Sequence, residues 1–251
     1  MSPLGPAQVD ELFHIAFLEV LTKRLDPSRF VLKGGANLRF FFGSVRFSED
    51  IDIDITGVPE WRLAEKVDDI LASAPMAALL RAADLGVVES SHPKGTETTQ
   101  RWKVAVGAPG QPRPIRTKIE FSYRNGDDRF LLEPIASEIV EPYALRPPSV
   151  QHYVGGAPVE QKVAALADRS ETQARDVFDL DLLLRRQPLA AGALERTLLA
   201  RAVDRALELP FAAFRDQVLP FLDPDVTELY AGEESWLQMQ TFVAGKLEEA
   251  R

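Results

Sequence analysis

The sequence predicts an α+β fold in which strands mix with helices in the first half of the chain and helices alone fill the second half. Segments with the period-two alternation typical of strands all lie before Pro147. From Pro158 onward, apolar residues recur at helical spacing. A strand predicted over residues 50–56 carries aspartate at three alternate positions, although aspartate is a poor strand former. The first half is therefore where chemistry is expected.

Turn residues divide the first half into short predicted elements of both kinds. Helices are predicted over residues 7–25, 36–42 and 60–82, and Pro75 can interrupt the last of these. Strands are predicted over residues 30–33, 50–56, 87–89, 98–106, 115–123 and 131–140. Those between residues 84 and 124 are expected to be antiparallel, because turn residues separate them.

The second half is predicted to hold helices over residues 159–168, 176–185, 191–207, 211–219 and 234–249. The stretch from Pro147-Pro148 to Gly155-Gly156 is rich in residues that break regular structure. We therefore predict one domain over residues 1–147 and a helical domain over residues 148–251.

The composition excludes several kinds of protein. The 251 residues include no cysteine, which excludes disulfides and thiolate metal sites, and the three histidines lack zinc-site spacing. No apolar run approaches the roughly 20 residues of a membrane span, and residues 1–6 do not resemble a signal peptide, so we expect a cytoplasmic protein with no membrane partner. The net charge of −9 argues against nucleic-acid binding over the whole surface but leaves room for a local basic groove.

Asp50, Asp52 and Asp54 are predicted to share one face of their strand, while the intervening isoleucines pack on the other. Like charges this close need a cation between them, and carboxylate oxygens suit Mg²⁺. An EF-hand calcium loop is excluded, because Ile55 and Trp61 stand where glycine and glutamate are required. A solvated strand edge is the remaining alternative. The acidic strand thus favours phosphoryl or nucleotidyl transfer with Mg²⁺ as cofactor.

Gly34-Gly35 separates a predicted strand from a predicted helix. Backbone N–H groups at the start of a helix can bind phosphate, although a tight turn that only glycine fits is the simpler interpretation. Lys33 is correspondingly either a phosphate partner or a cation at the end of a strand.

Glu120 lies in the middle of a predicted strand, between apolar residues. A carboxylate from a neighbouring strand is what a two-metal site requires, with one metal activating the attacking hydroxyl and the other holding nucleotide phosphates. Alternatively, Glu120 pairs with a cation such as Lys118 or Arg116 on the sheet surface.

The helical half carries a second group of charges. Lys162 and Arg169 are seven residues apart and share a helix face, and Asp176 and Asp179 share another. A lysine can contact a triphosphate as a point charge. The alternative is exposed helix faces joined by ion pairs, for example Arg169 with Asp176.

Taken together, these residues resemble the AbiEii-type nucleotidyltransferase toxins of type IV toxin–antitoxin systems, a group that includes the MenT-like tRNA-modifying toxins. The resemblance spans residues 33–179. The matching pieces are Lys33-Gly34-Gly35, Leu38-Arg39, Arg46-Phe47-Ser48-Glu49-Asp50-Ile51-Asp52, Lys118-Ile119-Glu120, Lys162-Val163-Ala164-Ala165-Leu166, Arg169, Arg175-Asp176 and Asp179.

The resemblance implies a DNA-polymerase-β-like nucleotidyltransferase core over residues 1–147, to whose site the helical domain would contribute Lys162 and Asp176. It implies that the catalytic residues are Asp50, Asp52, Lys162 and Asp176. The expected metal ligands are Asp50 and Asp52, with Glu120 completing the site. The expected nucleotide-binding residues are Lys33, Gly34, Gly35, Arg39, Ser48 and Arg169.

We therefore expect a Mg²⁺-dependent enzyme that transfers NMP from an NTP to the 3′ acceptor end of tRNA and so blocks translation. Its expected protein partner is a cognate antitoxin. Two alternatives stay open. One is NMP transfer to a hydroxyl of a protein or a small molecule. The other is a non-catalytic protein that binds GTP or another nucleotide and acts through a partner.

Overall fold

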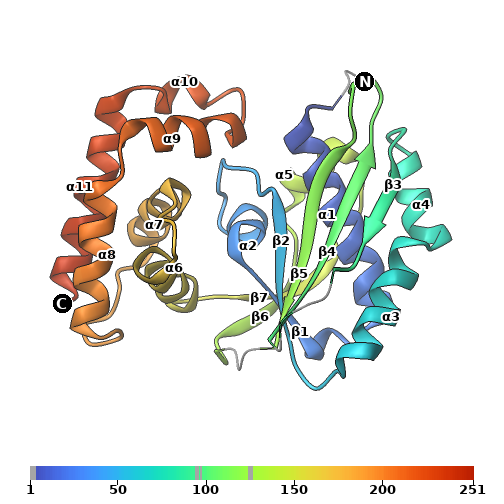
Figure 1. The fold of residues 1–251 in the computed structure, drawn as a ribbon, viewed down its shortest axis with the longest axis horizontal. Coiled ribbons are helices and arrows are strands. Elements are labelled where there is room, and N and C mark those ends of the chain that lie inside the picture. The colour runs from blue at the N-terminus through green and yellow to red at the C-terminus, as the bar shows by residue number, and fades with distance from the viewer. Residues whose placement is uncertain (1–3, 94–95, 97, 124–126) are drawn as a thin grey trace. The chain divides into compact units, whose positions relative to one another are not determined.

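The structure, a computed structural model, describes residues 4–93, 96, 98–123 and 127–251. It divides into two compact units (Figure 1). The sheet unit comprises Met1–Phe41 and Phe47–Tyr153, and the helical unit comprises Phe42–Arg46 and Val154–Arg251. No helix among the described residues has the length and apolar character needed to cross a bilayer.

A seven-stranded mixed sheet forms the centre of the sheet unit, in the order β3-β4-β5-β2-β1-β7-β6. The β1–β7 and β2–β5 pairs are parallel and the other pairs are antiparallel. This mixed sheet confirms the predicted α+β class. The strands are β1 (Phe30–Lys33), β2 (Asp50–Ile55), β3 (Gly86–Ser91), β4 (Thr99–Gly107), β5 (Ile115–Ser122), β6 (Phe130–Pro134) and β7 (Ser149–Tyr153).

Helices cover one face of this sheet. Helix α1 (Pro6–Arg24) is buried around most of its circumference and lies behind β4 and β5 in Figure 1. It packs with α3 (Glu60–Leu71) and α4 (Ala74–Arg81) over fully buried side chains such as Phe17, Trp102 and Phe121. The Trp102 indole donates to Asp68 of α3 at 2.8 Å, which satisfies its N–H within the core. The remaining helices of the unit are α2 (Gly34–Phe41) and α5 (Ser137–Val140).

The helical unit has its own core, in which Phe214 and Trp236 stack with ring centroids 4.8 Å apart. Residues 42–46 join this unit, because Val45 accepts a backbone hydrogen bond from Asp223 and Arg46 bridges to Leu222. The helices are α6 (Ala157–Asp168), α7 (Ala174–Arg186), α8 (Arg196–Glu208), α9 (Phe211–Gln217), α10 (Thr227–Tyr230) and α11 (Glu233–Glu249).

Two predicted elements are divided in the structure. Residues 60–82 form two helices, with the interruption beside Pro75 as predicted, since Ser73 caps α4 by accepting a hydrogen bond from Met76. The strand predicted over residues 131–140 ends at Pro134, and α5 follows from Ser137, so the second part of this prediction is wrong.

The sequence also missed a strand at the junction of the two units. Residues 149–153, which were predicted to belong to the helical half, form β7 of the sheet. The helical unit begins at Val154 rather than after residue 147, and it takes in residues 42–46 as well.

Candidate active site

The predicted carboxylates lie on the face of β2 opposite its isoleucines. Ile51, Ile53 and Ile55 are at most 2% exposed on the other face, as the alternation predicted. The parallel register sets Asp52 directly beside Glu120 of β5 and Asp50 beside Lys118. Two carboxylates on neighbouring strands therefore share one row of the sheet.

Cations from neighbouring strands balance these charges. The Lys118 amino group lies 2.9 Å from the Asp50 carboxylate. Glu120 accepts from Nε and Nη2 of Arg101, which lies opposite it on β4, at 2.8 and 2.5 Å. The partner of Glu120 is thus Arg101 rather than Lys118 or Arg116. The neighbouring strands supply part of the positive charge that the acidic strand requires.

Asp54 is the most enclosed carboxylate of the strand, at 8% exposed. Lys33 of β1 donates to its Oδ1 at 2.5 Å and to the Ser122 hydroxyl at 3.1 Å. The Tyr153 hydroxyl donates to Asp54 Oδ2 at 2.8 Å, and burial together with Asp54 raises the pKa of Tyr153. Sequence analysis missed Tyr153, because it lies 99 residues from Asp54 and no local pattern links them.

The glycine turn lies against the acidic strand. Gly34 has φ +71°, in the left-handed region, and a Cβ placed there would lie 2.6 Å from Asp52 Oδ2. Only glycine satisfies both conditions. Ser48, just before β2, donates to the backbone carbonyl of Asp50 at 2.8 Å. Gly34 and Ser48 therefore each contact one of the two aspartates, and Gly35 continues from the turn into α2.

Arg39 of α2 holds two helices together. Its guanidinium donates to both oxygens of Glu11 on α1 at 3.1–3.2 Å and stacks over the Phe47 ring, 4.2 Å from the centroid. The side chain is 12% exposed. Arg39 is therefore a fixed part of the contact between α1 and α2.

A buried polar layer lies beneath β2. Thr117 donates to the backbone carbonyl of Glu49 at 2.7 Å, so its oxygen must accept from His14 Nε2, also at 2.7 Å. Burial lowers the pKa of His14 to about 4 despite the opposing charge of Asp50. Asp10 is 6% exposed and its Oδ1 has no hydrogen-bond partner among the described residues. Burial, followed by the charges of Asp50 and Glu49, raises the pKa of Asp10 to about 8.

Metal binding requires several ligand atoms to converge. Within the described parts of the chain, no three Asp, Glu, His or Cys side chains meet closely enough to hold a metal ion. The donor set itself suits Mg²⁺, because the carboxylate oxygens of Asp50, Asp52 and Glu120 share one face of adjacent strands.

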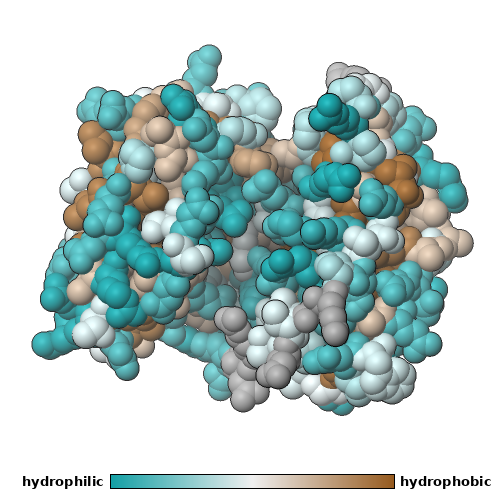
Figure 2. Space-filling view, in the orientation of Figure 1, coloured by the Kyte–Doolittle hydropathy of each residue, from teal (hydrophilic) through white to brown (hydrophobic). Residues whose placement is uncertain are grey.

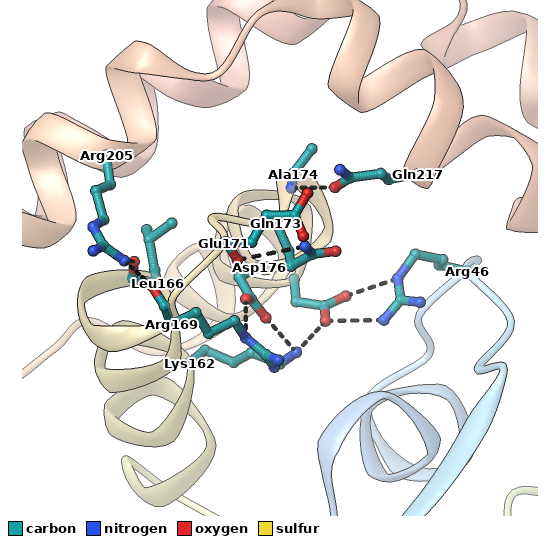
Figure 3. Close-up of polar contacts among 11 residues, drawn as sticks. Arg46, Lys162, Leu166, Arg169, Glu171, Gln173, Ala174, Asp176, Arg205 and Gln217 are labelled. Atoms are coloured by element: carbon teal, nitrogen blue, oxygen red, sulfur yellow. Dashed lines mark hydrogen bonds and ion pairs between the residues drawn. The ribbon is translucent and has the colours of Figure 1, made fainter. Parts of the chain in front are cut away.

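The helical unit contains a second charged cluster (Figure 3). The Lys162 amino group lies 3.0 Å from Asp176 and 2.6 Å from Asp179, and both carboxylates are fully buried. Arg46 forms two hydrogen bonds to Asp179, at 3.2 and 3.0 Å. Arg169 Nε lies 2.9 Å from Asp176 Oδ2, so the predicted ion pair forms, but its carboxylate is buried and does not lie on an exposed helix face.

Electrostatics keep this cluster charged despite its burial. Burial by itself favours neutral Asp179, but Arg46 and Lys162 outweigh it and hold the pKa of Asp179 at about 2. Burial likewise opposes the charge on Lys162, and Asp179 and Asp176 overcome it to raise the pKa of Lys162. Arg46 was not predicted as a partner of Asp179, because 133 residues separate the two.

The predicted residues fall into two sets, one in each unit. The helical unit holds Lys162, Arg169 and Asp176. The sheet unit holds Lys33, Gly34, Gly35, Arg39, Ser48, Asp50, Asp52 and Glu120.

Comparison with known proteins gives a consistent result. JHP933 from Helicobacter pylori has a similar structure, with a TM-score of 0.57 and 20% sequence identity over 99% of this chain and 96% of that one. A putative nucleotidyltransferase from H. pylori has a TM-score of 0.55 and 19% identity, and the match covers 95% of each chain. No curated protein matches the sequence. The family model described as "Nucleotidyl transferase AbiEii toxin, Type IV TA system" matches residues 16–247. The chain therefore belongs to the AbiEii nucleotidyltransferase toxin family.

Proposed function

We propose that this chain is a Mg²⁺-dependent nucleotidyltransferase that transfers NMP from an NTP to the 3′ acceptor end of tRNA, and that a cognate antitoxin restrains it. Membership of the AbiEii family supports nucleotidyl transfer and a toxin–antitoxin role. The observation that carries the proposal is the row formed by Asp52 and Glu120, with Asp50 on the same face and the Gly34 backbone against Asp52.

Asp50 and Asp52 would hold Mg²⁺, with Glu120 as the third carboxylate. When bound, the ions would activate the acceptor hydroxyl and neutralise the negative charge of the triphosphate. Lys118 and Arg101 now neutralise Asp50 and Glu120, and both are about half exposed. They can therefore move from the carboxylates to phosphate oxygens without crossing a buried core.

The Gly34 turn would receive the phosphates. The absence of a Cβ leaves the backbone close to Asp52, and the N–H groups at the start of α2 favour an anion. Lys33, Ser48 and Arg39 support this part of the site. Lys33 is fixed by Asp54, Ser48 by the Asp50 carbonyl and Arg39 by Glu11.

Lys162, Arg169 and Asp176 are proposed as further active-site residues on the strength of the family resemblance. Their cluster includes three cations, with Arg46, against two carboxylates, so it retains one excess positive charge. The Arg169 side chain is 41% exposed, whereas Lys162 is enclosed by Asp176 and Asp179. Arg169 is therefore the member best suited to reach a triphosphate.

Transfer of label from each α-³²P NTP to total tRNA tests the proposal directly. Asp52→Asn keeps the side-chain volume but removes the charge, so we expect transfer to fall by about 10²-fold or more. Asp69→Asn, on the exposed surface of α3, is the matched control and should retain full activity.

Each of the other possible outcomes would contradict a particular part of the proposal. Label on a protein or small molecule in place of tRNA would overturn the acceptor assignment. Nucleotide binding without label transfer to any acceptor would point to a non-catalytic nucleotide-binding protein. Full transfer by Asp52→Asn would remove the acidic face from the mechanism.

A further inference from the structure

The solvent face of β4 and β5 carries four cations beside the acidic row. Arg101 and Lys103 lie on β4, and Arg116 and Lys118 lie on β5. The register places Arg101 opposite Glu120 and Lys103 opposite Lys118, so these side chains share the face of Asp50 and Asp52. Hydrophilic residues predominate over these strands in Figure 2. We call these four residues the basic face.

Lys103 and Lys118 form a like-charge pair directly across two strands. Such pairs destabilise a sheet unless an anion lies nearby. Lys118 is balanced by Asp50 at 2.9 Å, whereas the Lys103 side chain is exposed and forms no ion pair with any described residue. Arg116 lies 3.7 Å from Glu89, and that pair is largely exposed. Lys103 and Arg116 are therefore cations available to an external anion.

The strand order determines the side from which an acceptor would approach. The sheet runs β4-β5-β2-β1, so the basic face and the Gly34 turn lie on opposite sides of the acidic strand β2. In phosphoryl transfer the attacking and leaving oxygens are roughly in line, on opposite sides of the phosphorus. With the leaving pyrophosphate at the Gly34 turn, the attacking hydroxyl must come from the side of β5 and β4.

We propose that the basic face binds the phosphate backbone of an RNA acceptor and so guides its 3′ end to Asp50 and Asp52. This inference rests on the proposed function and deepens it by placing the acceptor. The phosphates of a polyanion can form ion pairs with the four cations, whereas a neutral small molecule that offers a hydroxyl cannot. The protein's net charge of −9 makes such a local concentration of positive charge the feature that would attract RNA.

The test measures binding of fluorescently labelled tRNA by anisotropy, without NTP, so that no transfer takes place. Lys103→Glu/Arg116→Glu is expected to raise Kd about tenfold or more. It should also reduce the slope of log K against log salt by about 1–2, because two phosphate contacts are lost. Arg62→Glu/Arg81→Glu makes the same charge change on α3 and α4, which cover the opposite face, and should leave Kd within about twofold.

Steady-state transfer separates this inference from the proposed function. If both hold, the basic-face variant raises KM for tRNA and leaves KM for the NTP unchanged. Equal weakening by the two double variants, or wild-type binding by Lys103→Glu/Arg116→Glu, would overturn the basic face as the RNA site even if transfer to tRNA occurs. Binding that depends on the basic face, in a protein that transfers no label, would overturn the proposed reaction alone. Circular dichroism spectra and melting curves matching wild type would show that the substituted residues are not needed for folding.

Discussion

The sheet unit and the helical unit both set cations against carboxylates, but they do so in opposite environments. On the sheet face, Arg101 and Lys118 are 47% and 46% exposed, and each pairs with one carboxylate. In the helical unit, Asp176 and Asp179 are fully buried and share Lys162 between them. The same residue types thus form exchangeable pairs in one unit and a fixed network in the other.

This difference indicates which cluster can change partners during a reaction. An exposed pair loses little when it opens, because water solvates both charges. A buried charge that loses its partner has no such replacement, and breaking the pair is costly. We therefore propose that exchange with phosphate and metal takes place on the sheet face, and that Asp179 holds Lys162 of α6 and Arg46 in place.

The largest expected effect follows from breaking the buried network. Asp179→Asn would leave Arg46 and Lys162 with too little negative charge in a dry environment, so we expect a loss of about 3–5 kcal/mol in unfolding free energy. Urea denaturation at pH 7 measures it. Asp216→Asn, in an exposed pair with Arg215, is the matched control and should leave the midpoint almost unchanged.

The pH dependence checks the same assignment. The pKa of Asp179 lies at about 2, below its ordinary value of 3.8. Its stabilisation is therefore fully present above pH 3.8 and is lost as the pH falls through 2. An Asp179→Asn protein as stable as wild type at pH 7 would show that the network is dispensable, and the contrast between the units would fail.

Asp10 presents a third environment, a buried carboxylate with no cationic partner among the residues that the structure describes. Its folded pKa of about 8 exceeds the ordinary 3.8, so the unfolded chain ionises first and wild-type stability falls as the pH rises from 4 to 8. Asp10→Asn stays neutral. Its stability relative to wild type should therefore rise by about 3 kcal/mol between pH 4.5 and pH 7. Urea titrations in metal-free buffer at several pH values would reveal this slope, and a difference independent of pH would contradict it.

The Gly34 turn gives a smaller effect that links stability to the site. Gly34→Ala forces both a left-handed backbone and a contact with Asp52 Oδ2, which we expect to cost on the order of 1–3 kcal/mol. Gly110→Ala is the matched control, because Gly110 has φ +75° but nothing within 4 Å of its Cβ. The difference between the two variants in thermal melts isolates the contact with Asp52. Equal losses would mean that the turn conformation alone matters.

Local sequence patterns predicted much of the fold and part of the candidate site. The alternation of Asp50, Asp52 and Asp54 predicted a shared face because period two is a property of the strand itself. The position of Gly34 between strand and helix similarly predicted a turn. These features depend only on neighbours in the chain, which is why the sequence was sufficient for them.

Long-range pairing accounts for what was missed. Residues 149–153 were not recognised as β7, since their buried His152 is accommodated by Asn37 and Glu133, which lie far away in the sequence. Arg46 lies four residues before Asp50 in the chain but belongs to the other unit, because residues 42–46 join Leu222 and Asp223. No periodicity encodes such contacts.

The smallest expected effect concerns the exposed pairs, and it is the most sensitive test of the contrast between the units. A double-mutant cycle of Arg101→Met and Glu120→Gln should give a coupling energy below about 1 kcal/mol, measured by urea denaturation. The coupling should shrink further between 0.05 and 0.5 M salt, because salt screens charges that are in contact with water. Buried pairs are screened much less, so a coupling that persists at high salt would show that Arg101 is held as firmly as Arg46. Arg101 would then be unable to leave Glu120 when metal and phosphate bind, and the exchange proposed for the sheet face would fail.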